Sequence, residues 1–229
     1  MAARVIVFDL DDTLYPERRY ACSGLRAAGA YAASAFGITR LADVSVDLFH
    51  HGRRGDVFQE ALRRLGIVDS DGTIVSALVE AYRSHVPSLD LFPDVAEVLP
   101  RLQSLGRIAV LTDGYLPPQR LKVSALGLDR IANPIVYTEE LGREHWKPSP
   151  TGFVRIESIC GAAPQECVYV ADNPRKDFVA PAERGWTTVR MRRLGTEHGP
   201  LEGQGEIQLT MSDFLELERW LLASRGRAV

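Results

Sequence analysis

The sequence predicts an α/β protein in which a doubly wound parallel sheet is interrupted, after its first strand, by an all-helical insertion. From residue 90 onward, short apolar runs alternate with amphipathic segments at helical spacing. Strands that alternate with helices in this way form parallel sheets covered on both faces. Residues 15–89, in contrast, show helical patterns only. We therefore expect a sheet domain of residues 1–14 and 90–229, and a helical domain of residues 15–89.

The first strand is expected at residues 5–8, a continuous apolar run that suits a strand buried on both faces. It is followed closely by Asp9, Asp11 and Asp12. Carboxylates this close repel one another, and a bound cation such as Mg²⁺ offsets the repulsion. Asp9 and Asp11 are therefore a candidate metal-binding and catalytic pair. A second interpretation stays open here, because acids after a strand also cap helices or face solvent.

Four helices are expected in the insertion, because apolar residues recur at helical spacing in each segment, and glycine or proline follows most of them. These helices span residues 20–36, 41–49, 56–65 and 73–86. Asp71 is the expected N-cap of the last one.

The alternating pattern after residue 90 predicts five helices and four strands. The helices are expected at residues 93–105, 117–126, 149–160, 176–184 and 212–222, and the strands at 107–111, 134–137, 167–171 and 187–191. Ser212 is the expected N-cap of the last helix, and the Gly-rich, charged residues 195–206 are expected to form a loop.

Polar residues follow three of the predicted strands. These clusters are Asp9 with Asp11, then Thr112-Asp113-Gly114, and finally Asp172-Asn173 with Asp177. In open parallel sheets, ligands bind outside the carboxyl ends of the strands. We therefore expect all three clusters at one edge of the sheet, which favours a functional site over three unrelated solvated loops.

Such an edge can support phosphoryl transfer. One strand-end carboxylate can attack as a nucleophile, while a second protonates the leaving oxygen and later deprotonates water. Mg²⁺ held by Asp9, Asp172 and a carbonyl near Asp11 would offset the charge of a phosphoryl group. The groups that could bind the phosphoryl oxygens are the Thr112 hydroxyl, the amides of Asp113 and Gly114, and Lys147.

In this order, the clusters resemble the four motifs of the haloacid dehalogenase (HAD) superfamily. The motifs are Asp-x-Asp-x-Thr, Thr-Asp-Gly, Lys-Pro and Asp-Asn-Pro-x-x-Asp, and the resemblance covers residues 1–14 and about 90–229. It implies a Rossmann-like core with a helical type-one cap. Ala171 stands where many members have Gly, and Asp113 where many have Asn; neither change removes a needed group.

The resemblance also implies the roles of the site residues. Asp9 would be the nucleophile and Asp11 the general acid/base, while Thr112, Asp113, Gly114 and Lys147 bind the phosphoryl group. The implied cofactor is Mg²⁺, with Asp9, Asp11 and Asp172 as its site and with Asn173 and Asp177 in support.

Within this family, Asp11 indicates a phosphatase, because dehalogenating members lack this carboxylate. The expected substrate is a small phosphorylated metabolite, either a sugar phosphate or a nucleoside monophosphate. A phosphomutase of the same fold, or a non-catalytic binding or regulatory member, remains an alternative. Arg53 and Arg54 lie between two glycines of the helical insertion and could bind a second anion of the substrate.

Composition argues against several other classes. The net charge of −3 provides no basic field for nucleic acid or an anionic membrane. No run of about 18 apolar residues predicts a membrane-spanning helix. Three cysteines without paired spacing indicate reduced thiols. The predicted first strand begins at residue 5, which leaves no room before it for a signal peptide. A cytoplasmic protein is therefore expected. A monomer or a homodimer is expected.

Overall fold

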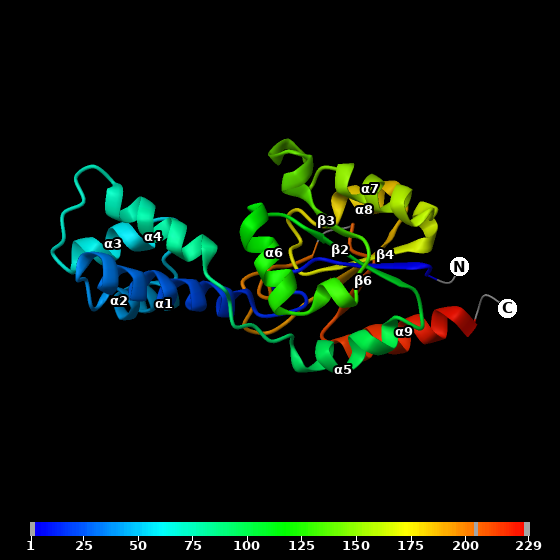
Figure 1. The fold of residues 1–229 in the computed structure, drawn as a ribbon. Coiled ribbons are helices and arrows are strands. Elements are labelled where there is room, and N and C mark those ends of the chain that lie inside the picture. Colours follow the sequence, from blue (N-terminus) through cyan, green and yellow to red (C-terminus); the bar gives the residue numbers. More distant parts are fainter. Residues whose placement is uncertain (1–2, 204–205, 227–229) are drawn as a thin grey trace. The chain divides into compact units, whose positions relative to one another are not determined.

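The computed structural model describes residues 3–203 and 206–226, which form two compact units (Figure 1). One contains the described residues up to Glu17 and from Asp90 onward, and is called the sheet unit here; the other, Arg18–Leu89, is the helical unit. The sheet unit thus extends three residues beyond the predicted boundary at residue 14. Tyr15 belongs to it because its side chain is fully buried and its hydroxyl donates to Asp11.

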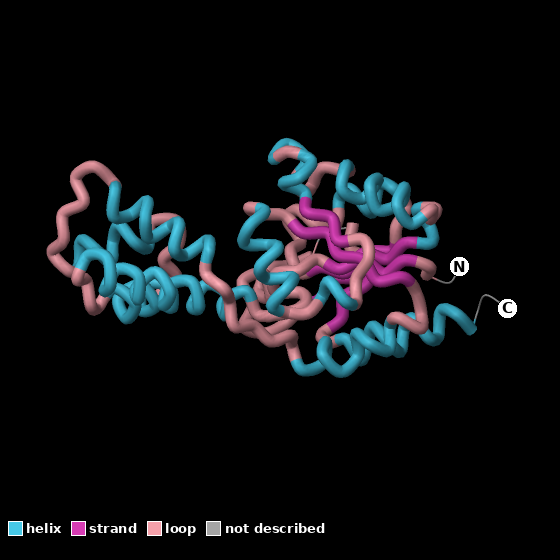
Figure 2. Tube along the Cα trace, viewed as in Figure 1, coloured by secondary structure: helices cyan, strands magenta, loops and turns pink. Residues whose placement is uncertain are grey.

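The strands of the sheet unit gather in one sheet, drawn magenta in Figure 2. The sheet has six strands, and every described pair of neighbouring strands is parallel. The order is β3-β2-β1-β4-β5-β6. The strands are β1 (Val5–Phe8), β2 (Arg107–Thr112), β3 (Ile135–Tyr137), β4 (Cys167–Ala171), β5 (Thr187–Met191) and β6 (Leu209–Met211). The predicted doubly wound parallel sheet is therefore confirmed.

Helices cover both faces of this sheet (Figure 1). Side chains alternate between the two faces along each strand, so the buried strands place apolar side chains on both. Val5 and Val7 of β1 belong to the core cluster that also contains Phe153 and Phe178. Phe8 faces the other way and stacks on Phe214, with ring centroids 5.3 Å apart. The helices of the first face are α7 (Thr151–Cys160) and α8 (Val179–Arg184); those of the second are α5 (Pro93–Leu102) and α9 (Phe214–Gly226).

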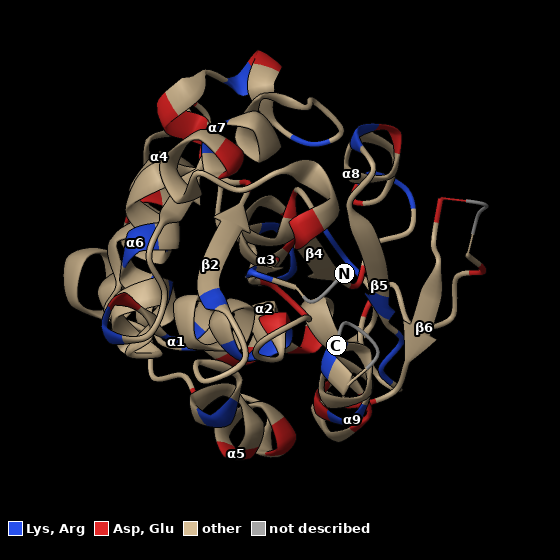
Figure 3. Ribbon diagram, turned by 90° about the vertical axis from the view of Figure 1, so that its right-hand side faces the viewer, with Lys and Arg blue, Asp and Glu red and all other residues tan. Residues whose placement is uncertain are grey.

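The outer helices carry charges of both signs (Figure 3). On α5 and α9, which pack against each other, Arg101 Nε lies 2.6 Å from Glu218 Oε1. None of the helices in the described residues is long and apolar enough to span a membrane.

The register of the central strands determines where the polar clusters meet. Phe8, the last residue of β1, pairs with Val110 of β2 and with Val170 of β4. The three strands therefore end at nearly the same level, and the residues that follow them share one edge of the sheet. We call this edge the rim.

The remaining elements of the sheet unit connect its strands. They are α6 (Leu116–Ala125) and the short 3₁₀ helices Leu128–Arg130, Thr138–Leu141, Arg143–His145 and Pro164–Glu166.

The helical unit has its own hydrophobic core, which contains Leu25, Leu41, Leu62 and Leu78. Its helices are α1 (Glu17–Phe36, which begins in the sheet unit), α2 (Leu41–His50), α3 (Val57–Arg64) and α4 (Thr73–Ser84). The predicted cap of α4 needs a correction. Gly72 holds the N-cap position; Asp71 accepts a bond from Thr73 N, and Asp69 accepts bonds from the amides of Ile74 and Val75.

Several other elements differ from the predictions. The helix expected from residue 176 starts at Val179, and β6 was not predicted. The last helix starts at Phe214, where Asp213 rather than Ser212 accepts the bond from the Glu216 amide. Residues 204–205 of the predicted loop 195–206 lie outside the described residues.

Candidate active site at the carboxyl ends of the strands

Three buried carboxylates meet at the rim. Asp9 follows β1, Asp172 follows β4, and Asp177 lies five residues further on; one oxygen of each lies within 4.8 Å of the others. Asp172 Oδ2 is buried and has no hydrogen-bond partner. Burial, together with the charge of Asp9, raises the pKa of Asp172 well above its ordinary value. Oxygens arranged in this way, one of them without a donor, are suited to a hard divalent cation.

Lys147 is the counter-charge of this carboxylate cluster. Its buried ammonium donates to Asp9 Oδ1 at 2.5 Å and to the Tyr169 hydroxyl at 2.9 Å, and it lies 2.8 Å from Asp177 Oδ1. Burial alone would lower the pKa of Lys147, but Asp177 and Asp9 raise it well above the ordinary value. Burial also raises the pKa of Asp9, to about 7. Lys147 therefore stays charged beside the strand-end carboxylate.

The loop after β2 is shaped by Gly114 and Gln119. Gly114 has φ +124°, a conformation that favours glycine, and a Cβ there would lie 3.2 Å from Gln119 Cδ. The Gln119 amide donates to Thr112 Oγ1 at 2.6 Å. Asp113 accepts bonds from the Thr138 hydroxyl and the Lys147 amide, and lies 2.9 Å from Lys176 Nζ.

Asp11 is not part of the carboxylate cluster. Its Oδ1 accepts bonds from Lys122 Nζ, at 2.7 Å, and from the Tyr15 hydroxyl, and its Oδ2 accepts from Gln119 Nε2 at 3.1 Å. Burial opposes ionisation, but Lys122 and the other donors lower the pKa of Asp11. At the rim, Asp11 is thus a separate carboxylate with donors of its own.

Two further residues hold the loops in place. Asn173 Oδ1 accepts a bond from the backbone N–H of Arg175, and the backbone N–H of Asn173 donates to Asp177 Oδ2. Asp12, with φ +54°, accepts from the amides of Glu17 and Glu197. Neither side chain is bound to the carboxylate cluster.

The rim thus brings together the predicted residues Asp9, Asp11, Thr112, Asp113, Gly114, Lys147, Asp172, Asn173 and Asp177. The carboxylate cluster contains Asp177 in addition to Asp9 and Asp172. The predicted metal site had Asp11 as its third residue, contributing through a nearby carbonyl. Arg53 and Arg54 belong to the helical unit. Arg53 donates to Asp56 at 2.7 Å, and Arg54 stacks on Phe49, with its guanidinium carbon 3.9 Å from the ring centroid.

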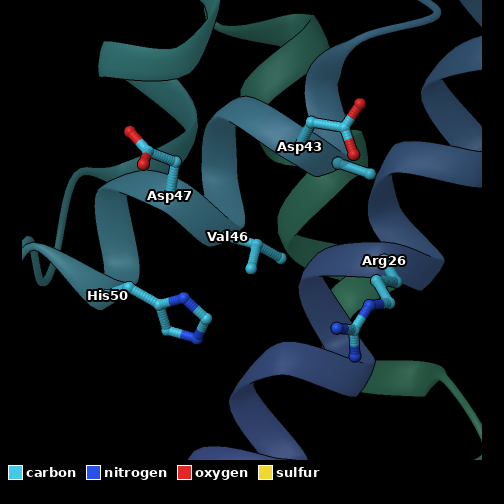
Figure 4. A pocket seen from close by; sticks show the side chains of 6 residues that line it. Arg26, Asp43, Val46, Asp47 and His50 are labelled. Atoms are coloured by element: carbon cyan, nitrogen blue, oxygen red, sulfur yellow. The ribbon is translucent and has the colours of Figure 1, made fainter.

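The helical unit contains a pocket of its own (Figure 4). It is lined by Arg26 of α1 and by Asp43, Asp47 and His50 of α2. The carboxylate cluster of Asp9, Asp172 and Asp177 lies in the sheet unit, and this pocket lies in the helical unit.

Four side chains at the rim were not predicted: Gln119, Lys122, Tyr169 and Lys176. They lie on α6, within β4, and after β4, where nothing in the local sequence says which way a side chain points. One signal was available, because lysine is rare in this chain and each of its three lysines lies at the rim.

Comparisons with known proteins identify the family of the chain. Residues 3–183 match the family model described as haloacid dehalogenase-like hydrolase. A glyceraldehyde 3-phosphate phosphatase of Methanopyrus kandleri is 32% identical over 202 residues, covering 83% of this chain and 84% of that protein. An (S)-2-haloacid dehalogenase 4A of Burkholderia cepacia is 30% identical over 149 residues, 63% of this chain and 61% of that protein.

Among solved structures, the magnesium-bound HAD hydrolase YfnB of Bacillus subtilis superposes with a TM-score of 0.69. It is 16% identical, and the match covers 96% of this chain and 99% of that one, so it shows a shared fold. The family model covers most of the chain. The chain is therefore an enzyme of the haloacid dehalogenase-like hydrolase family.

Proposed function

We propose that this enzyme is a Mg²⁺-dependent phosphatase that hydrolyses a small phosphomonoester through an aspartyl-phosphate on Asp9. The observation that carries the proposal is the division of the rim carboxylates into two environments. Asp9 lies with Asp172 and Asp177 in a cluster that favours a cation, whereas Asp11 lies apart beside Lys122. Two acids in different environments can take different roles in one reaction.

The residues present fit a magnesium ion. The carboxylates of Asp9, Asp172 and Asp177 would hold it, and the unpartnered oxygen of Asp172 is the feature of the structure that supports this. When bound, Mg²⁺ would favour the ionised form of these carboxylates and offset the charge of the phosphoryl oxygens.

Each side chain of the site then has one role in the reaction. An oxygen of Asp9 attacks phosphorus, and the ester oxygen leaves with a proton from Asp11. For this step Asp11 must be protonated, although Lys122 and the other donors favour its carboxylate in the free enzyme. Water then attacks the phosphorus of the aspartyl-phosphate and gives a proton to Asp11. This step releases inorganic phosphate and restores the Asp9 carboxylate. Lys147, the Thr112 hydroxyl and the backbone amides after β2 stabilise the charge on the phosphoryl oxygens.

The test is phosphate release from p-nitrophenyl phosphate and from glyceraldehyde 3-phosphate, with and without Mg²⁺. We expect Asp9→Asn, and the removal of divalent metal with a chelator, each to lower kcat by about a thousandfold or more. Phosphate release by Asp9→Asn at the wild-type rate would refute the mechanism. Interconversion of two sugar phosphates with little free phosphate would instead identify a phosphomutase.

We propose a small sugar phosphate as the substrate class, because a relative that matches most of the chain is a phosphatase of a three-carbon sugar phosphate. The similarity to a dehalogenase favours a second candidate, the hydrolysis of 2-haloacids. Halide leaves without a proton, so that reaction needs no carboxylate at position 11. We therefore expect no halide release from 2-chloropropionate; its release at a rate above that of phosphate would favour the second candidate.

Substrate binding by Arg53 and Arg54 stays a prediction. Since Arg53 is already paired with Asp56, it would have to exchange this partner for a substrate anion. We expect Arg53→Ala and Arg54→Ala to raise KM several-fold while kcat stays within about twofold. The matched control is Arg63→Ala, which removes an exposed arginine paired with Glu60. Unchanged KM in both variants would exclude the role.

A further inference from the structure

The basic residues of this chain are distributed unevenly between arginine and lysine. There are 27 of them, of which 24 are arginine and only Lys122, Lys147 and Lys176 are lysine. Each lysine contacts a rim carboxylate: Lys122 reaches Asp11, Lys147 reaches Asp9 and Asp177, and Lys176 reaches Asp113. All the other residues in this count are arginines. Lysine is thus confined to places where a compact ammonium lies beside a carboxylate of the site.

Lys122 has the geometry of a residue that holds another in place. It lies on α6 with 4% of its surface exposed, and its ammonium is 2.7 Å from Asp11 Oδ1. The same oxygen accepts the hydroxyl of Tyr15, which is fully buried. Lys122 and Tyr15 therefore fix one oxygen of Asp11 from two different segments of the chain.

Gln119, one turn earlier on α6, fixes the other oxygen. Its amide donates to Asp11 Oδ2 at 3.1 Å and to Thr112 Oγ1 at 2.6 Å, so it links the two predicted site residues directly. A carboxylate offers about four acceptor positions, and described side chains use three on Asp11. Oδ2 therefore keeps a position that a substrate oxygen or a water can use.

We propose that Lys122 is a positioning residue for proton transfer: together with Gln119 and Tyr15, it holds the Asp11 carboxylate beside Thr112 at the rim. This inference rests on the proposed function, because it assigns Lys122 to the step in which Asp11 protonates the departing alcohol. Lys122 acts through Asp11 and does not touch the phosphoryl group. Arginine would not replace it easily, since its planar guanidinium is larger than the ammonium that occupies this buried position.

The test compares two esters that differ in their need for an acid. The alcohol of glyceraldehyde 3-phosphate must take up a proton as it leaves, whereas p-nitrophenolate leaves without one. Since kcat/KM covers the steps up to release of the alcohol, Lys122→Met should lower it about 10- to 100-fold for glyceraldehyde 3-phosphate. For p-nitrophenyl phosphate we expect less than about a threefold change. Equal losses for both esters, or no loss for either, would overturn the inference.

The matched control is Arg120→Met, two residues away on α6. Arg120 is exposed and pairs with Glu140 at 2.6 Å, so its removal should leave kcat/KM for both esters unchanged. If Arg120→Met reproduces the selective loss, the effect comes from α6 in general, and the role of Lys122 is refuted.

A second measurement covers the case in which Lys122→Met, with Asp11 left unpaired, folds poorly. In the Asp11→Asn background, adding Lys122→Met should change kcat/KM for glyceraldehyde 3-phosphate by less than about twofold, because the group on which Lys122 acts is gone. A further loss as large as in the wild-type background would refute the inference.

The two proposals fail in different ways. If the wild-type enzyme releases phosphate from neither ester, the proposed function fails. If it releases phosphate, requires Asp9, and Lys122→Met is as active as wild type on glyceraldehyde 3-phosphate, only the inference about Lys122 fails.

Discussion

Asp172 lowers the stability of the folded state as long as no ligand binds its buried oxygen. Its Oδ2 is buried without a donor, and the carboxylates of Asp9 and Asp177 lie within 4.8 Å. An unsatisfied buried oxygen and mutual repulsion both disfavour folding. Residues that lower stability in this way are typical of functional sites, where the ligand supplies the missing interaction.

We therefore predict opposite effects of one substitution with and without metal. In a chelator, Asp172→Asn should raise the melting temperature or leave it unchanged, because it removes one of three close carboxylates, which repel one another when ionised. With excess Mg²⁺ the wild-type melting temperature should rise by several degrees, and that of Asp172→Asn should not, since binding to the folded state stabilises it. Thermal denaturation followed by circular dichroism measures both.

The matched control for this prediction is Asp129→Asn, an exposed aspartate of the sheet unit. It should respond to Mg²⁺ as the wild type does. An equal Mg²⁺ response in Asp172→Asn would mean that Asp172 does not hold the ion.

At the level of residues, the sequence indicated the site as far as the ends of the strands. Asp9, Thr112 and Asp172 follow apolar runs directly, so their place at the rim follows from the topology of a parallel sheet. The donors around Asp11 could not be predicted in the same way. Gln119 and Lys122 lie on α6, and which side of a helix faces the rim depends on how that helix packs.

At the level of elements, Asp94 ties together three parts of the sheet unit. It lies in the first turn of α5 and accepts two bonds from Arg193, which follows β5, and one from the amide of Phe214, the first residue of α9. The Arg193 guanidinium also lies over the Phe92 ring, 4.1 Å from its centroid. Burial works against the ionised form, but Arg193 and the Phe214 amide lower the pKa of Asp94.

This pKa shift predicts how stability depends on pH. Because the folded state lowers the pKa of Asp94, its contribution is complete above the unfolded-state value near 4 and is lost as the pH falls through the folded-state value. Asp94→Asn should lower the free energy of unfolding by about 1–2 kcal/mol at pH 7. The difference from wild type should shrink below about pH 4. Urea denaturation at pH 7 and at pH 3 measures it.

The control is Glu97→Gln on the same helix, where the exposed carboxylate lies 3.4 Å from Arg101. It should change the free energy of unfolding by less than about 0.5 kcal/mol. A loss in Asp94→Asn that is as large at pH 3 as at pH 7 would contradict an electrostatic role for Asp94.

Element boundaries were predictable where local chemistry decides them and not where tertiary contacts do. β1, β4 and β5 match their predicted residues because continuous apolar runs mark buried strands. β6 is only three residues long and has no such run; it exists because it pairs with β5. In α8, the predicted first turn is absent, because Asn173 and Asp177 hold residues 173–177 as a loop at the site.

At the level of the whole molecule, the chain has separate hydrophobic cores in its two units. Phe153 and Trp186 belong to the core of the sheet unit, and Leu62 and Leu78 to that of the helical unit. The three tryptophans of the chain, Trp146, Trp186 and Trp220, all lie in the sheet unit. Tryptophan fluorescence therefore reports on one unit, and circular dichroism reports on both.

We predict that a cavity in the helical unit makes the unfolding transitions measured by circular dichroism and by tryptophan fluorescence differ. Leu78 is fully buried, so Leu78→Ala should lower the free energy of unfolding of the helical unit by about 2–4 kcal/mol. In urea, the change in circular dichroism should then begin before the change in tryptophan fluorescence. Val68→Ala, at a position that is 84% exposed, should leave both transitions in place. Coincident, equally shifted transitions in Leu78→Ala would mean that the two units unfold together.

The sequence by itself determined the architecture and the chemical character of this protein. Alternating apolar and amphipathic runs specify a parallel sheet, and the strand-end motifs specify a family, because both depend on residues that are close in the chain. Tertiary structure alone decided which carboxylates share a cluster. It placed Asp177 with Asp9 and Asp172 and gave Asp11 its own donors, Lys122 and Gln119 among them, across more than a hundred residues. Those contacts depend on the packing of α6 and of the loop after β4, which no local pattern records.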